Sequence, residues 1–133
     1  MRSAILAIPA KLRPLGLASF PFGACGDASL LLGAYLADNG FEGFRQVQAE
    51  RGSRQDDTWT SHAWLETTDL VVDITADQFS DAPAAIIVAE KSEWHLVFEI
   101  RRRGPSDFRE FIGPAIPQLH DLYAELLRSI PPL

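Results

Sequence analysis

Residues 23–39 read GACGDASLLLGAYLADN, and this stretch decides how the rest of the chain must be arranged. Wound as a helix it is apolar nearly all round, and such a helix is normally covered by neighbours on several sides. We therefore expect a buried helix over 27–39, ended by a left-handed turn at Asn39-Gly40. Gly33 disfavours the helix by about 1 kcal/mol relative to Ala, which predicts close backbone packing at that position.

After this helix the apolar residues recur with the period of two that is typical of strands. Gly104-Pro105 ends the pattern, and a short helical turn over 107–112, capped by Ser106, is expected to follow. The final segment carries apolar residues at helical spacing from Ile116 to Ile130, which predicts a helix covering the sheet. The expected strands are 44–50, 59–66, 69–75, 85–89 and 93–100; the second and third form one hairpin and the last two another.

The order of helix, antiparallel strands and covering helix predicts an α+β fold. A length of 133 residues fits a single domain over 1–133 that buries its own core. Residues 1–22 contain three prolines and are expected to form short strand and turn pieces on the surface.

Composition narrows the function classes. The chain is 47% apolar and 23% charged, which is ordinary for a globular protein, and its net charge of −6 argues against a nucleic-acid partner. The triplet Arg101-Arg102-Arg103 is interpreted as a solvated strand end. No apolar run approaches the ~20 residues of a membrane span, and Pro9 interrupts the N-terminal apolar run short of a signal peptide. A single cysteine excludes an intramolecular disulfide and favours a cytoplasmic location.

That one cysteine, Cys25, stands at the start of the predicted helix, where the helix dipole favours a thiolate and free backbone N–H groups can bind an oxyanion. His62 and Asp73 follow on two expected strands. If Leu65 pairs with Leu70, His62 lies opposite Asp73 on one face of the hairpin, whereas a one-residue slip separates them. The sequence thus predicts a nucleophile, a base and a group that orients the base.

Three neighbours are candidates for oxyanion binding or substrate positioning. Gly26 leaves room for a carbonyl to approach the backbone beside the cysteine. Trp64 shares the face of His62 and is expected either to wall the cleft or to pack there. Gln78 follows the strand of Asp73, where a turn can return its amide to the site.

Other interpretations remain open from the residues alone. Cys25 can be a buried structural residue. A zinc site is the metal alternative, although the dense spacing of structural zinc motifs is missing, and we expect no metal or cofactor. A serine nucleophile lacks the Gly-x-Ser-x-Gly elbow, and His120 on the final helix is assigned to the surface or to packing. The zinc alternative uses Cys25, His62 and Asp73, with or without His95; the serine alternative uses Ser29 or Ser61.

Residues 23–79 resemble the transglutaminase-like branch of the papain-like cysteine enzymes, including the small bacterial leader peptidases of lasso-peptide maturation. The resemblance lies in Cys25 opening a helix, in the strand motif His62-Ala63-Trp64 and in Asp73-Ile74-Thr75. It implies a papain-like fold with these three residues as the catalytic triad. Papain-type enzymes carry an oxyanion glutamine a few residues before the nucleophile, but residues 19–22 here read SFPF.

The expected function is cysteine-dependent acyl chemistry on a peptide or protein amide, with hydrolysis by a peptidase or deamidase favoured. Transfer to an amine, as in a transglutaminase or acyltransferase, is one alternative. A catalytically inactive, partner-binding module of the same fold is the other. No nucleic-acid or membrane partner is expected.

Overall fold

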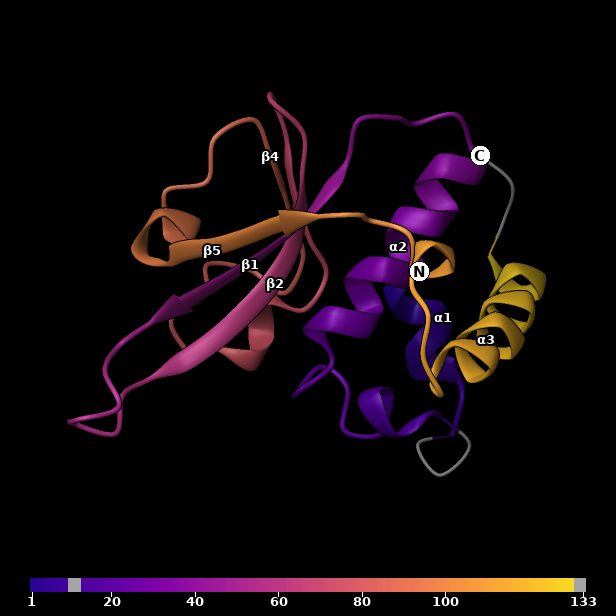
Figure 1. Ribbon diagram of the computed structural model, residues 1–133, viewed down its shortest axis with the longest axis horizontal. Coiled ribbons are helices and arrows are strands. Elements are labelled where there is room, and N and C mark those ends of the chain that lie inside the picture. Colours follow the sequence, from indigo (N-terminus) through magenta and orange to yellow (C-terminus); the bar gives the residue numbers. More distant parts are fainter. Residues whose placement is uncertain (10–12, 131–133) are drawn as a thin grey trace.

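The computed structural model describes residues 1–9 and 13–130, and within these the chain forms three α-helices and a five-stranded sheet (Figure 1). The helices are α1 (Arg2–Ala7), α2 (Cys25–Asp38) and α3 (Ile116–Ser129). The strands are β1 (Arg45–Arg51), β2 (Thr60–Glu66), β3 (Val71–Asp73), β4 (Ile87–Ala89) and β5 (Glu99–Gly104). The predicted α+β class is confirmed. Of the helices described here, none is both long and apolar enough to cross a membrane.

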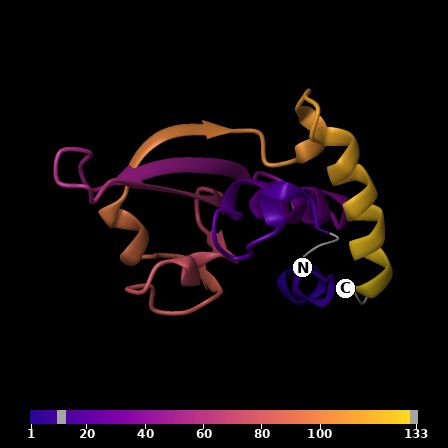
Figure 2. The same cartoon turned by 90° about the horizontal axis from the view of Figure 1, so that it is seen from below.

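The strands lie in the order β4-β3-β2-β1-β5, and every neighbouring pair is antiparallel. Helix α2 packs against β1 and β2, and it lies between the sheet and α3 (Figure 2). All of residues 28–34 in α2 are buried, as expected of a helix that is apolar on most sides. The chain leaves α2 through Gly40, whose φ of +83° supplies the predicted left-handed turn.

Two apolar clusters hold the sheet. The larger one joins the three helices to the inner face of the sheet and includes Leu31, Leu65 and Leu126. The smaller one lies on the outer face, where Val47 and Ala49 of β1 meet an aromatic group formed by Trp64, Phe79, Trp94 and Phe98. Both faces of β2 are therefore covered, and the side chains from His62 to Leu65 are all buried.

The β2–β3 hairpin has a different register from the one predicted. Leu65 pairs with Val72 rather than with Leu70, because the four-residue loop lies one residue later in the chain, where the N–H of Thr67 donates to the carbonyl of Leu70. The pairing thus shifts by two residues, and an even shift keeps every side chain on its predicted face. Asp73 ends β3 on the same face as His62 but is not directly opposite it.

The predicted hairpin over 85–100 is wrong. Strand β4 pairs with β3 at one edge of the sheet, and β5 pairs with β1 at the other. Between them the chain forms a 3-10 turn, η4 (Trp94–Val97), which crosses the outer face. The alternating apolar residues at 94, 96, 98 and 100 fit a strand. The chain forms a turn instead, because the turn packs the rings of Trp94 and Phe98 into the outer apolar cluster.

The expected surface pieces in 1–22 are also wrong where the structure describes them. Residues 2–7 form a helix whose Ile5 is fully buried, and Leu17 in the 3-10 turn η2 (Leu15–Leu17) is buried as well. Residues 10–12 lie outside the described part. The final helix is confirmed, but it packs on α1 and on the 3-10 turn η5 (Phe108–Glu110) rather than on the sheet. Its apolar stripe completes the helical core, since α2 already covers the sheet there.

Turn η5 differs from the prediction in its cap. The side chain of Asp107, not Ser106, accepts the backbone N–H of Arg109. The guanidinium of Arg109 in turn donates to Asp38 at the end of α2, which also accepts from the hydroxyl of Tyr123 in α3. These bonds tie both long helices to the turn and fix the position of α2 from its C-terminal end.

Gly33 packs against the backbone, as predicted. A Cβ at this position would lie 1.7 Å from the carbonyl oxygen of Ser106. We expect Gly33→Ala to lower the free energy of unfolding by about 2 kcal/mol, since backbone must move to relieve the overlap, despite the higher helix propensity of Ala. Urea denaturation measures the change. Gly26→Ala, in the same helix with nothing within 4 Å, is the matched control and should be neutral or slightly stabilising; equal stability of the two variants would contradict the packing argument.

Candidate functional site

The structure brings Cys25, His62 and Asp73 together from three elements. Cys25 is the first residue of α2, His62 lies in β2, and Asp73 is the last residue of β3. The side chains of His62 and Asp73 are fully buried, whereas Cys25 is half-buried and lines a surface hollow. The group therefore has an accessible sulfur in front of a buried acid–base pair.

Asp73 is the most constrained of the three. Its Oδ2 accepts from Nε2 of His62 at 2.6 Å and from Nε2 of His95 at 2.7 Å, and its Oδ1 accepts from the backbone N–H of Thr75 at 2.9 Å. Burial alone would raise the pKa of Asp73, but the hydrogen bonds from His62 and His95 outweigh it and lower the pKa to about 2. The carboxylate is thus ionised and can only accept hydrogen bonds.

This carboxylate sets the tautomer of His62. Because Asp73 only accepts, Nε2 of His62 carries the proton between them, and Nδ1 is the nitrogen left for the cleft side. Nδ1 lies 3.0 Å from the amide nitrogen of Gln78. Burial lowers the pKa of His62, yet the bonds to Asp73 and Cys25 raise it overall to about 9. Below pH 9 the imidazole is therefore protonated and forms an ion pair with an ionised Cys25.

The surroundings of Cys25 favour its thiolate. Burial raises the pKa of the thiol, but hydrogen bonding and charge attraction from His62, together with the backbone N–H of Ala63 and the amide of Gln78, lower it overall. Strand β3 pairs only with Leu65 and Glu66 of β2, so the edge of β2 beside Ala63 is left for the first turn of α2. The predicted thiolate environment thus depends on where β3 ends.

Two polar side chains, one from α2 itself and one from β1, fix the first turn of α2. The hydroxyl of Ser29 donates to the carbonyls of Cys25 and Gly26 at 2.6 and 2.9 Å. The amide of Gln46 donates to the carbonyl of Gly26 at 3.0 Å and to the Ser29 hydroxyl at 2.7 Å. The buried Ser29 hydroxyl is therefore engaged in structural hydrogen bonds and is not a nucleophile. These bonds hold the first turn of α2, and with it Cys25, in a fixed position.

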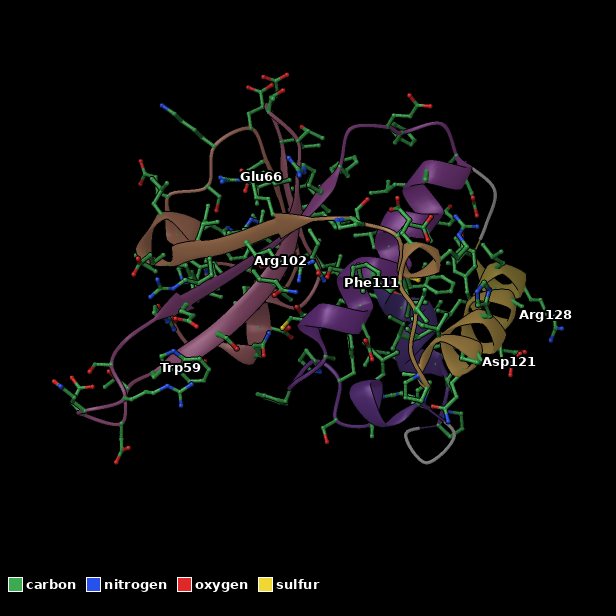
Figure 3. The ribbon with its side chains drawn as sticks, viewed as in Figure 1. Trp59, Glu66, Arg102, Phe111, Asp121 and Arg128 are labelled. Carbon is green, nitrogen blue, oxygen red and sulfur yellow. The ribbon has the colours of Figure 1, made fainter. Side chains whose placement is uncertain are left out.

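A hollow of about 350 Å³ opens in front of the sulfur and continues into a second one of about 430 Å³. The two share Glu50, Trp59 and Arg101, so together they form one cleft along the sheet. Trp59 lies where the two hollows join, next to β2 and far from the helices (Figure 3). Arg101 is an extra residue of β5, since Gln48 pairs with Arg102 and Ala49 with Ile100. Because of this bulge, Arg101 lines the cleft.

The other predicted residues are divided between cleft and core. Gly26 and Ser61 line the hollow, and Gln78 contacts both His62 and Cys25. Trp64 does not wall the cleft: it is 2% exposed and packs on His95 with ring centroids 4.6 Å apart. His120 is exposed on α3 and lies beside Phe108, as assigned. A larger hollow of about 680 Å³ lies elsewhere, between residues 7–9, residues 13–14 and α3.

In the described part of the chain, one group of metal-binding side chains is close enough to share an ion. It consists of His62, Asp73 and His95, with ligand atoms within 4.8 Å of one another, and it leaves Cys25 out of the zinc alternative. Ligand atoms on one tetrahedral zinc lie about 3.3 Å apart, given bonds of about 2.0–2.2 Å. The N–O separations of 2.6 and 2.7 Å are shorter and match N–H···O⁻ bonds, so the group fits hydrogen bonding better than a metal.

Sequence reasoning missed several residues that complete the site. Gln46 and Arg101 carry no local motif, and their roles come from pairing across the sheet. Ser92, His95 and Phe98 follow one another at intervals of three, which is the repeat of a 3-10 helix. The spacing is compatible with a turn, but the alternating apolar residues of the same segment fit a strand equally well, so the sequence alone does not bring His95 to Asp73.

Asp73→Asn tests the buried carboxylate. The pKa of Asp73 is about 2 in the folded chain and ordinarily 3.8, so its ionised form stabilises the fold fully above about pH 4 and loses this contribution as pH falls through 2. We expect the substitution to lower the free energy of unfolding by about 3 kcal/mol at pH 7 and by clearly less at pH 3, measured by urea denaturation. Asp121→Asn, on the outer side of α3 (Figure 3), is the surface control. A difference that is the same at both pH values would contradict this account.

Comparison of the chain with protein-family models, with curated proteins and with solved structures gives no match in any of the three. The interpretation of the site therefore depends on its own geometry. The site combines the half-buried thiol of Cys25, whose pKa is lowered, with the imidazole of His62, whose pKa is raised. The buried carboxylate of Asp73 fixes the orientation of that imidazole. A cleft leads to the sulfur. Such an arrangement can carry out nucleophilic attack on a carbonyl with proton transfer.

Proposed function

We propose that this chain is a cysteine enzyme of the transglutaminase-like branch of the papain-like superfamily, and that it hydrolyses an amide bond of a peptide or protein. The observation that carries the proposal is the Cys25–His62–Asp73 group, in which a buried anion fixes the proton position of a base beside a thiol. The α+β fold, with the cysteine opening a central helix packed on an antiparallel sheet, supports it.

In the first half of the reaction the Cys25 thiolate attacks the amide carbonyl carbon, and a C–S bond forms while the carbonyl electron pair moves to oxygen. The backbone N–H of Cys25 supplies one oxyanion donor, because the first N–H groups of a helix have no intrahelical acceptor. Gln78 is the second candidate. When His62 holds a proton on Nδ1, the Gln78 N–H loses that acceptor and is free to donate to sulfur or to the oxyanion.

The C–N bond then breaks, and the leaving amine takes the Nδ1 proton of His62. In the second half, His62 removes a proton from water, the hydroxide attacks the thioester, and Cys25 leaves as the thiolate. Asp73 stays ionised throughout: it holds the Nε2 proton and stabilises the imidazolium without taking a proton itself. Each proton taken from one group is returned by the end of the cycle.

The cleft supports a peptide as substrate. It extends from Cys25 along the strands and past Trp59, whose ring is covered by the guanidinium of Arg54 at 4.0 Å. Side chains of both charges line it, with Arg101 paired to Glu50 at 3.0 Å and to Glu99 at 3.2 Å. An extended chain with polar side chains matches this lining better than a small apolar ligand. A single thiol committed to chemistry fits the cytoplasm, where thiols stay reduced.

The pH dependence of Cys25 alkylation by iodoacetamide tests the nucleophile. The thiol should react with a midpoint well below the ~8.5 of a free cysteine, since the pKa of Cys25 is lowered chiefly by His62 against the opposing effect of burial. In His62→Ala the midpoint should rise toward or above that value, with a fall of at least about tenfold in rate at pH 6.5. His120→Ala is the matched control and should leave the profile unchanged.

An inert thiol, or the same profile in the wild type and in His62→Ala, would contradict the proposal and favour the non-enzymatic, partner-binding alternative. A reactive thiol directs the next measurement to products. Mass spectrometry of a peptide mixture incubated with the enzyme separates cleavage, which adds water across a bond, from deamidation of glutamine. Addition of a primary amine reports the transferase alternative, because the amine then appears in the product in place of water.

A further inference from the structure

A second histidine lies behind the triad. The imidazole of His95 shares Oδ2 of Asp73 with His62, and its other ring nitrogen contacts the hydroxyl of Ser92. The four groups form one unbroken chain, from Ser92 through His95 and Asp73 to His62. The His95 side chain is 4% exposed, and those of Asp73 and His62 are fully buried. A buried polar chain of this length has to be fully satisfied, and it is.

The proton positions along this chain of hydrogen bonds follow from the ionised carboxylate of Asp73. Asp73 is ionised and accepts only, so His95 donates from Nε2, as His62 does. When the ring of His95 is neutral, its Nδ1 is an acceptor and the hydroxyl of Ser92 donates to it. Each group therefore fixes the orientation of the next, and the direction of donation runs from Ser92 to the carboxylate.

The position of His95 is itself enforced by packing. Its ring lies 4.6 Å from that of Trp64 and 4.9 Å from that of Trp94, and it is stacked nearly parallel to His62 at 6.2 Å. Turn η4 contains both Trp94, which packs in the aromatic cluster, and His95, which donates to Asp73. The packing of the turn therefore also fixes the hydrogen bond.

We propose that His95, oriented by Ser92, is a positioning residue of the proposed triad: its N–H bond to Asp73 holds the carboxylate on Nε2 of His62 and so keeps Nδ1 of His62 as the base that faces Cys25. The inference rests on the proposed function. His95 touches neither the sulfur nor the cleft, and its effect on Cys25 passes through Asp73 and His62.

The bond from His95 has a specific consequence for the carboxylate. Oδ1 is already held by the N–H of Thr75, so Asp73 has one oxygen facing the two histidines. Without His95, that oxygen keeps a single side-chain donor in a fully buried site, and the ionised form loses one of the bonds that stabilise it. The carboxylate can then turn or take up a proton, and His62 loses the partner that defines its tautomer.

The charged groups around the pair are few and come from each neighbouring element. Cys25 of α2 and Asp73 of β3 face His62 directly. Arg51 of β1 stacks on the rings of Phe79 and Phe98 on the far side of the aromatic cluster, where the exposed Asp81 neutralises it. Changes in His62 can therefore be assigned to Asp73 and Cys25 rather than to a distant charge.

The first test reads the tautomer of His62 directly. The chain has three histidines, so a two-bond ¹H–¹⁵N spectrum of the imidazole rings is simple, and single substitutions assign it. Recorded above the His62 pKa of about 9, where the ring is neutral, the wild-type spectrum should show His62 protonated on Nε2. His95→Phe should lose this fixed state and give averaged nitrogen shifts, whereas His95→Gln, whose side-chain amide can still donate to Asp73, should restore it. This readout does not require any enzymatic activity.

The second test uses the pH profile of Cys25 alkylation and a double-mutant cycle. His95→Phe should raise the midpoint by about one pH unit, which lowers the rate about tenfold at pH 6.5, and Ser92→Ala should shift it in the same direction by less. In an Asp73→Asn background, His95→Phe should add no further shift, because its effect passes through the carboxylate. His120→Phe is the matched control on the surface and should change neither the profile nor the spectrum.

The outcomes separate this inference from the proposed function. An unreactive Cys25 combined with a His62 tautomer that depends on His95 would overturn the enzyme and leave the positioning role standing. A reactive Cys25 whose profile and His62 spectrum are unchanged in His95→Phe would overturn the positioning role alone. Additive shifts in the double mutant would also overturn it, since His95 would then act by a route other than Asp73. Urea denaturation of each variant verifies that the spectra come from folded protein.

Discussion

A carboxylate without solvent exposure has to be surrounded by donors, and Asp73 imposes this demand on the structure around it. Two imidazole N–H groups and one backbone N–H meet the demand, and they come from β2, from turn η4 and from the residues that follow β3. If one donor were removed, the ionised form would be left under-satisfied in the core, which is among the more costly defects that a fold can carry. The end of β3, the path of the turn over the outer face and the orientation of His62 are therefore coupled to one another through a single side chain.

The second requirement is access to the sulfur of Cys25, and it is met because strand β3 is short. Strand β3 pairs with only two residues of β2, which leaves the part of β2 around Ala63 for the first turn of α2. Gln46 and Ser29 hold that turn from β1 and from within the helix, and the Gly33–Ser106 contact and the Asp38 network fix the helix further along its length. Cys25 thus lies at the junction of a rigid helix and an open strand edge, where a thiol can be both activated and reached.

Much of this arrangement follows from local pattern, and the remainder depends on tertiary contacts. The central helix could be predicted because its apolar residues and its stop signal at Gly40 both lie within the segment. The shared face of His62 and Asp73 could be predicted because it depends only on an even count along two strands, and it survived a register shift of two residues. Turn η4 and the first helix could not, because short apolar segments fit several local structures and packing selects among them. The apolar stripe of α3 could likewise be predicted from the sequence, but the elements on which it packs could not.

The opposite shifts of the Cys25 and His62 pKa values have a consequence for the proton inventory of folding. Consider pH values that lie above both the ordinary histidine pKa of 6.5 and the lowered pKa of Cys25, and below the raised His62 pKa of about 9. In this window an unfolded chain carries its proton on sulfur and none on the imidazole, while the folded site carries it on the imidazole and none on sulfur. The totals are equal, so forming the ion pair takes no proton from the solvent and releases none. Because the pH dependence of stability is set by the difference in bound protons, this pair contributes no slope there. Within this pH window the protein can thus hold a thiolate–imidazolium pair without linking its folding equilibrium to the acidity of its surroundings.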